Sequence, residues 1–158
     1  MAIIIAVGIV LDLVSKIIFA NLFVVPREDI TVINNFFYFT FLKNTGAAYG
    51  IFSGNTVLLA IVSIIFIIAF CVYDYFNHSN NGWYVGGMAL IISGAIGNLI
   101  DRLFLGYVRD FISIKIFSFV FNLADVFVTV GVIMFAVYLV ISIIQESKKK
   151  EKQDVEHK

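Results

Sequence analysis

Four long apolar segments account for more than half of this 158-residue chain. A helix needs about 20 apolar residues to cross about 30 Å of hydrocarbon. The four segments cover residues 2–24, 55–73, 84–105 and 121–144. The chain is 61% hydrophobic and 14% charged, whereas soluble domains are about 45–50% apolar and about 25% charged. The sequence therefore predicts an all-α membrane protein, a bundle of four transmembrane helices.

The charge pattern predicts one domain and its orientation. Residues 1–145 form a single integral-membrane domain, and residues 146–158 form a basic tail that follows the last span. Basic residues beside a span mark the cytoplasmic side, so an even number of spans puts both termini in the cytoplasm. The N-terminus lacks a basic region and a cleavage site, and we interpret it as a retained helix rather than a removed signal peptide.

The segment between the first two spans is predicted to be outside and structured. Residues 36–42 are aromatic and strand-prone, and a Gly-Ala-rich turn is expected over residues 46–50. We expect a small extracytoplasmic β-cradle lying against the membrane. Its aromatic residues either anchor the interface or support a substrate segment, and both roles are compatible.

Three aspartates, Asp101, Asp110 and Asp125, are unusual for such a chain. A carboxylate at membrane depth costs about 2.5–3.5 kcal/mol. In the predicted topology all three lie at the outer boundary. Two neighbouring carboxylates share a proton, so one can act as a base and the other as an acid. The residues alone leave open whether Asp101 or Asp110 pairs with Asp125.

Each polar residue also has a purely structural interpretation. Asp101 and Arg102 could form a polar clamp at a helix end, Asp125 could be a helix cap, and a loop carboxylate such as Asp110 is usually solvated. Asp12 and Lys16 stand four residues apart in the favourable order for an ion pair. That pair is most simply structural.

Several other functions are disfavoured. The net charge is zero, so no nucleic-acid partner is expected. His78 and His157 have no metal-ligand spacing to the aspartates, and no cofactor motif is present. An alternative function is a non-enzymatic proton-coupled carrier or assembly subunit. The polar residues, however, gather at one boundary and do not line a path across the membrane.

Five strings resemble the lipoprotein signal peptidase family, the type II signal peptidases of bacteria. They occur in the family's order and span residues 12–125. The strings are DLVSK at 12–16, KNTGAAYG at 43–50, GAIGNLIDR at 94–102, GYVRDF at 106–111 and FNLAD at 121–125.

The resemblance implies a four-span aspartic endopeptidase of the bacterial cell membrane, with its active site on the extracytoplasmic face. Such an enzyme removes the signal peptide from a diacylglyceryl-modified prolipoprotein, just before the lipidated cysteine. The substrate and the membrane lipid are its implied partners, and a monomer is expected. The family's catalytic pair corresponds to Asp110 and Asp125. Its support and substrate-binding residues correspond to Asp12, Lys16, Asn44, Gly46, Asn98, Asp101, Arg102, Asn122 and Ala124.

The chain departs from the family pattern at three places. Arg109 stands where a small apolar residue is usual. If it points inward, this cation should favour the ionised form of Asp110 and leave the proton on Asp125. The connection over residues 112–120 is short, and Val120 replaces a frequent proline. These departures concern loop geometry and substrate preference.

Overall fold

The computed structural model describes residues 1–23, 29–46, 52–117 and 119–156, and these contain four helices and four strands. All four helices are long and apolar enough to cross a membrane. In chain order the elements are α1 (Ala2–Leu22), β1 (Ile30–Ile33), β2 (Phe37–Asn44), α2 (Thr56–Asn77), α3 (Gly82–Leu105), β3 (Val108–Ile114), β4 (Val120–Phe121) and α4 (Leu123–Glu156). The predicted combination of four apolar helices and a small sheet is therefore confirmed.

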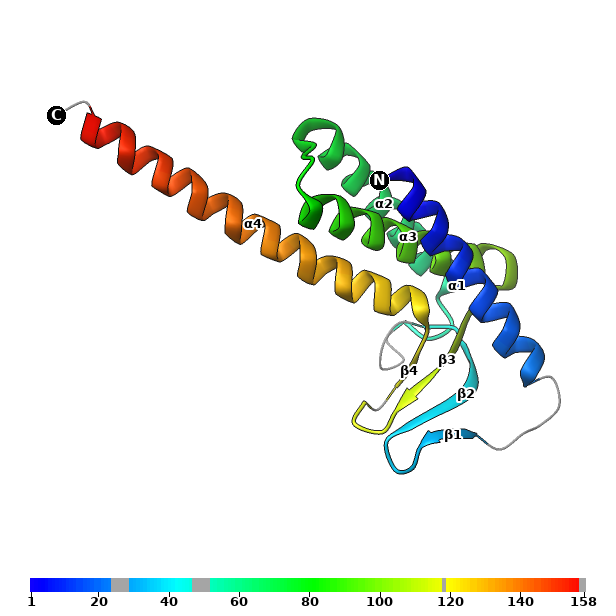
Figure 1. Ribbon diagram of the computed structural model, residues 1–158. Coiled ribbons are helices and arrows are strands. Elements are labelled where there is room, and N and C mark those ends of the chain that lie inside the picture. The colour runs from blue at the N-terminus through cyan, green and yellow to red at the C-terminus, as the bar shows by residue number, and fades with distance from the viewer. Residues whose placement is uncertain (24–28, 47–51, 118, 157–158) are drawn as a thin grey trace.

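The helix ends differ from the expected spans in informative ways. Helix α2 continues to Asn77, and α3 already begins at Gly82 because the Asn81 side chain accepts a hydrogen bond from the Trp83 amide. Helix α4 is 34 residues long, about 51 Å at 1.5 Å per residue. The lysine-rich tail thus continues the last helix as far as Glu156 and projects well beyond the other helices (Figure 1).

Helix α3 is the centre of the bundle. Half of the residues in an apolar stretch of 18 residues of α3 are buried, whereas only 6% of the residues in the corresponding stretches of α2 and of α4 are buried. It packs against all three other helices. The large apolar side chains of α1, α2 and α4 that remain exposed suit a lipid environment, since polar surface there would be costly.

Small residues allow α3 and α4 to approach closely. A Cβ atom added to Gly87 would lie 2.8 Å from the Phe135 amide nitrogen and 2.9 Å from the Gly131 carbonyl oxygen. Both neighbours are backbone atoms, which cannot move without separating the helices. Close backbone approach at small residues is the usual means of helix association in membranes.

We expect Gly87→Ala to destabilise the bundle by about 1–3 kcal/mol, the usual cost of overpacking a core. Thermal unfolding in detergent measures the loss. Gly82→Ala is the matched control, because a Cβ added there meets no atom within 4 Å. Equal melting temperatures for the two variants would contradict this account of the α3–α4 contact.

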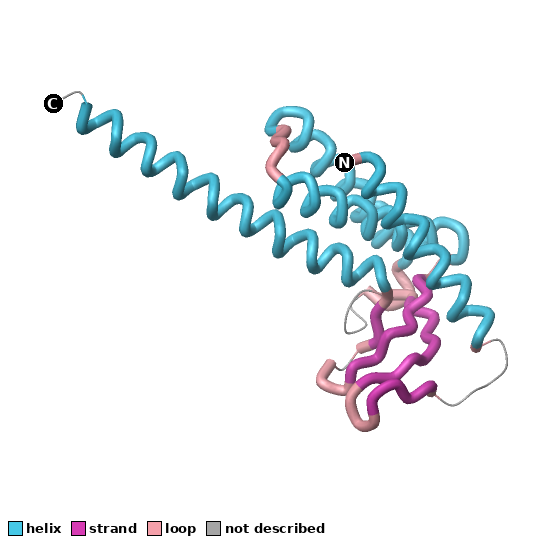
Figure 2. The backbone as a smooth tube through the Cα atoms, viewed as in Figure 1, coloured by secondary structure: helices cyan, strands magenta, loops and turns pink. Residues whose placement is uncertain are grey.

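The four strands form one antiparallel sheet in the order β1-β2-β3-β4. Figures 1 and 2 show it at one end of the bundle, while the N-terminus and the α2–α3 connection lie at the other end. Phe19 at the end of α1 stacks on Phe111 and contacts Phe39, with ring centroids 4.3 and 4.5 Å apart. The aromatic segment thus forms strand β2, as expected.

The connections between the helices and strands differ in part from those expected. The predicted Gly-Ala turn falls largely on residues 47–51, outside the described residues. The short connection over residues 112–120 is the β3–β4 hairpin. Asp110 lies within strand β3, so its interpretation as a loop residue was wrong. Gly106, with φ of +76°, ends α3 and turns the chain into that strand.

Candidate active site

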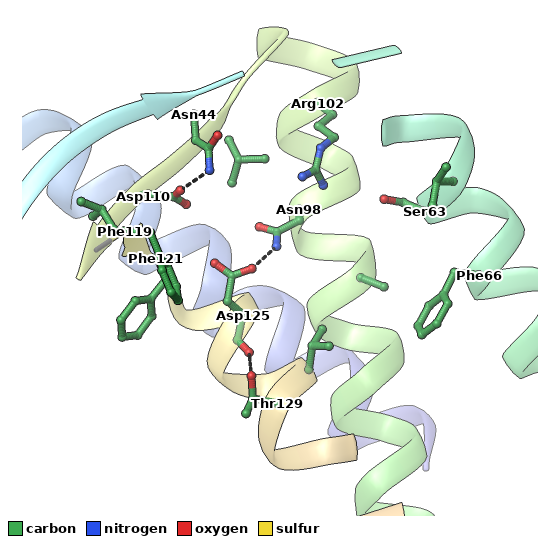
Figure 3. A pocket seen from close by; sticks show the side chains of 15 residues that line it. Asn44, Ser63, Phe66, Asn98, Arg102, Asp110, Phe119, Phe121, Asp125 and Thr129 are labelled. Atoms are coloured by element: carbon green, nitrogen blue, oxygen red, sulfur yellow. Dashed lines mark hydrogen bonds between the residues drawn. The ribbon is translucent and has the colours of Figure 1, made fainter. Parts of the chain in front are cut away.

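Asp110 and Asp125 line one cavity of about 440 Å³ where the helices meet the sheet. Figure 3 shows Asp110 and Asp125 facing the α3 residues Asn98 and Arg102, with Asn98 hydrogen-bonded to Asp125. The cavity is lined by Asn44, Val62, Ser63, Phe66, Ala95, Asn98, Arg102, Val108, Asp110, Phe119, Val120, Phe121, Asp125, Val128 and Thr129. Strand β3 and helix α4 therefore bring two carboxylates into a single pocket that is lined by both polar and apolar side chains.

Asp110 is held by two amide side chains. It is 1% exposed; its Oδ2 accepts a hydrogen bond from Asn44 Nδ2 at 2.8 Å and its Oδ1 accepts one from Asn122 Nδ2 at 2.6 Å. The Gly46 amide donates to Asn44 Oδ1 at 2.9 Å. That bond turns the nitrogen of the Asn44 amide toward Asp110 (Figure 3).

Asp125 stands in the first turn of α4 and is half-buried. The backbone amide of Asn122 donates to Asp125 Oδ2 at 3.0 Å, and the backbone amide of Asp125 donates back to Asn122 Oδ1 at 3.2 Å. This is a reciprocal helix cap. Asp125 Oδ1 accepts from Asn98 Nδ2 at 2.8 Å. The structural and the chemical interpretations of Asp125 therefore coexist.

Asn98 and Asn122 link the two carboxylates to the bundle core. Asn98 Oδ1 accepts from Lys16 Nζ at 2.9 Å and from Asn122 Nδ2 at 3.1 Å. The Asn98 oxygen is thereby occupied, so its nitrogen faces Asp125. Asn122 Nδ2 contacts both Asn98 and Asp110, which ties the pair to one network.

The predicted ion pair of α1 is present and fully buried. Lys16 Nζ lies 2.7 Å from Asp12 Oδ2, with both side chains 0% exposed. Asp12 Oδ1 accepts from the Ala124 amide at 2.9 Å, next to Asp125. Gly97 leaves the space that the Asp12 carboxylate fills. The pair thus fixes the beginning of α4 against α1 and α3.

The expected clamp between Asp101 and Arg102 was wrong. Asp101 instead binds Arg109: Nη2 donates to Oδ1 at 2.6 Å, while Nε and the backbone amide donate to Oδ2 at 3.2 and 3.0 Å. Lys16 Nζ lies 3.7 Å from the same carboxylate. Neighbouring helix residues point in different directions, and Arg102 lines the cavity.

The electrostatics distinguish the two aspartates. Burial first, and then the charge of Asp125, raise the pKa of Asp110 from its ordinary 3.8 to about 6, against the hydrogen bonds from Asn44 and Asn122, which lower it. Arg109 does not point inward toward Asp110, because its guanidinium is bound to Asp101. The condition for an ionised Asp110 with the proton on Asp125 is therefore not met.

All the residues expected at the site lie at it or support it through contacts. The pairing of Arg109 with Asp101 was not predicted from the sequence. The signal that could have predicted this pairing is sequence spacing: Arg109 follows Asp101 by eight residues, and the turn at Gly106 lies between them. Val62, Phe66 and Phe121, which form walls of the cavity, were not predicted either. Among the described residues, no group of three or more His, Cys, Asp or Glu is placed to hold a metal.

Comparisons with known proteins agree with this architecture. The family model described as signal peptidase (SPase) II matches residues 4–141. The lipoprotein signal peptidase of Clostridium novyi is 41% identical over 140 residues, 86% of this chain and 94% of the relative. That of Lactobacillus gasseri is 43% identical over 115 residues, 72% and 74% of the two chains. A solved structure described as a bacterial membrane enzyme is 32% identical, with a TM-score of 0.80 over 94% of this chain and 90% of that one.

Proposed function

Since the chain belongs to the signal peptidase II family and cleaves signal peptides from prolipoproteins, we propose that Asp110 and Asp125 are the catalytic residues of this cleavage. The observation that carries the proposal is that one cavity holds both carboxylates, with different surroundings. Unequal environments are what assign acid and base roles to two like groups. The enzyme is then an aspartic endopeptidase.

The proposed chemistry needs one proton on the pair. Asp110, with its raised pKa, holds that proton, and Asp125 is the base. Asp125 takes a proton from a water molecule as the water oxygen attacks the scissile carbonyl carbon. Asp110 donates its proton to the carbonyl oxygen, which gives a neutral tetrahedral intermediate. Asp125 then passes its proton to the leaving nitrogen as the carbon–nitrogen bond breaks. At the same time Asp110 takes a proton back from one hydroxyl group of the intermediate, which leaves a carboxylic acid as product and restores the single proton on Asp110.

The remaining family residues have supporting roles in this proposal. Asn44, Asn98 and Asn122 orient the carboxylates through their amides, and Gly46 orients Asn44. Asp12, Lys16, Asp101 and Ala124 hold the helices that carry them. Arg102 projects into the cavity, where it can donate to a peptide carbonyl of the substrate.

We also propose the finer substrate and topology. The substrate is a diacylglyceryl-modified precursor that is cut before the lipidated cysteine, with acyl chains left in the bilayer. The site faces the extracytoplasmic side. Lys148, Lys149, Lys150 and Lys152 lie on the far end of α4 from the sheet, which supports a cytoplasmic C-terminus. The protein acts as a monomer without a metal or cofactor.

The direct test is incubation of the purified protein with a diacylglyceryl-modified precursor, followed by mass spectrometry. We expect two products, one beginning at the lipidated cysteine. An unmodified precursor should be cleaved poorly. An intact lipidated precursor after prolonged incubation with folded protein would refute the proposal. A carrier function is not favoured, because the buried charges gather at the sheet end of the bundle.

The pKa of Asp110 predicts a pH dependence. Asp110 must be protonated to donate, so kcat/KM should fall as the pH rises through about 6. Asn44→Ala removes a hydrogen bond that lowers the pKa of Asp110. The pKa then rises, and the fall in kcat/KM moves to higher pH. Thr45→Val is the control, since Thr45 contacts Ser53 and neither carboxylate. A shift to lower pH in Asn44→Ala would contradict these roles.

A further inference from the structure

Five formally charged side chains surround the pair of carboxylates, and they separate into two groups. Asp12, Lys16, Asp101 and Arg109 contact one another in a chain of ion pairs. Two acids and two bases make this group formally neutral. Arg102 is the fifth side chain and stands apart from it.

In the part of the chain that the structure describes, Arg102 interacts with Asp125, Asp110 and Asp101 only through their charges. No hydrogen bond or ion pair joins it to any of those residues. Its guanidinium points into the cavity that Asp110 and Asp125 line (Figure 3). With one proton shared between those carboxylates, Arg102 balances their remaining charge. A partly buried guanidinium with free donors is an available ligand for a peptide carbonyl.

Arg109 accounts for this availability. It covers both oxygens of Asp101 with Nη2, Nε and its own backbone amide. Asp101 is 1% exposed, and a buried carboxylate needs a cation. Without Arg109, Lys16 would be the nearest remaining cation, and Asp12 already holds it at 2.7 Å. Arg102, on the same turn of α3, is the next cation able to bend back.

We propose that Arg109 is a positioning residue: by saturating Asp101, it keeps Arg102 free to hold the substrate carbonyl in the cavity. The inference rests on the proposed function, because it concerns substrate binding at the same site. Arg109 itself does not line the cavity and acts only through Asp101 and Arg102. The two-point contact of the Arg109 guanidinium with Asp101 matters here. A lysine at position 109 would bind Asp101 through one nitrogen and leave the other Asp101 oxygen available to Arg102.

The test compares steady-state kinetics of Arg109→Leu, Arg109→Lys and Arg109→Leu/Asp101→Asn on the lipidated precursor. We expect Arg109→Leu to raise KM about tenfold while kcat changes by less than about threefold, since a substrate contact is lost. Arg109→Lys should be intermediate. The added Asp101→Asn removes the charge that draws Arg102 away, so KM should return toward the wild-type value.

The matched control is Lys43→Leu. Lys43 is paired with Arg109 across β2 and β3 but lies over the Tyr107 ring, 5.1 Å from its centroid, and makes no contact with Asp101. Its KM should stay at the wild-type value. A purely structural role for Arg109 predicts a lower kcat at constant KM and a double variant worse than the single one.

Each of three results overturns the inference: wild-type KM in Arg109→Leu, no recovery in the double variant, or an equal rise in KM for Lys43→Leu. If Arg109→Leu does not fold, Arg109→Lys with and without Asp101→Asn carries the same comparison. The proposed function fails separately, because then the wild-type protein itself leaves the precursor uncut.

Discussion

The Asp125→Asn variant is expected to cleave the lipidated precursor at least about 10³-fold more slowly than the wild type, because an amide cannot take a proton from water. The fold should survive. The asparagine oxygen can still accept from Asn98 Nδ2, and the lost bond to the Asn122 amide costs about 1 kcal/mol, as for other helix caps. Product formation followed by mass spectrometry measures the rate, and thermal unfolding verifies the fold.

The same substitution at another carboxylate provides the control. Asp74 accepts from the Tyr84 hydroxyl at 2.8 Å and contacts His78 at the α2–α3 end of the bundle, away from the sheet. Asp74→Asn should therefore retain wild-type kcat. Turnover by Asp125→Asn within about tenfold of the wild type would remove Asp125 from the catalytic pair.

The largest expected loss of stability is that of Lys16→Met. Methionine fills a similar volume, but it leaves Asp12 and Asp101 without the ammonium that both approach. Breaking a buried ion pair on one side costs about 3–5 kcal/mol, because the remaining charge stays uncompensated. The melting temperature in detergent should fall sharply. Cleavage should fall too, since Asn98 loses the donor that orients it.

Two further variants test whether the loss of stability in Lys16→Met arises because the lost charge is buried. Lys150→Met removes a lysine from an exposed ion pair with Glu146, where such pairs contribute about 0–1 kcal/mol, so its melting temperature should barely change. Lys16→Met/Asp12→Asn should recover part of the loss, because one uncompensated carboxylate is gone. Similar melting temperatures for Lys16→Met and Lys150→Met would show that the buried network contributes no stability.

The spans were predictable because their signal is local. A run of about 20 apolar residues forms a helix in lipid whatever its neighbours do, since every backbone group must be bonded within the segment. Strand β2 was predictable for a related reason, because aromatic residues favour a half-buried pleated surface. The helix ends were less predictable. The Asn81 cap and the Gly106 turn set those of α3, and such signals are only one residue long.

The candidate site was predictable in residue identity but not in pairing. The family strings named Asp110 and Asp125, while the residues alone left Asp101 as a competitor. The structure separates them: Arg109 and Lys16 neutralise Asp101, whereas the hydrogen bonds to Asp110 come from amides. A carboxylate with two cations is an ion-pair partner, and one held by neutral donors keeps its capacity to exchange a proton.

By itself, the sequence determined that this chain enters a membrane with four helices, because hydrophobic burial depends on composition and length. Only the tertiary structure decided which oxygen faces which donor. The Asn98 amide could point either way until Lys16, 82 residues earlier, occupied its oxygen. Such choices depend on distances of about 3 Å between segments distant in sequence, which no local pattern encodes.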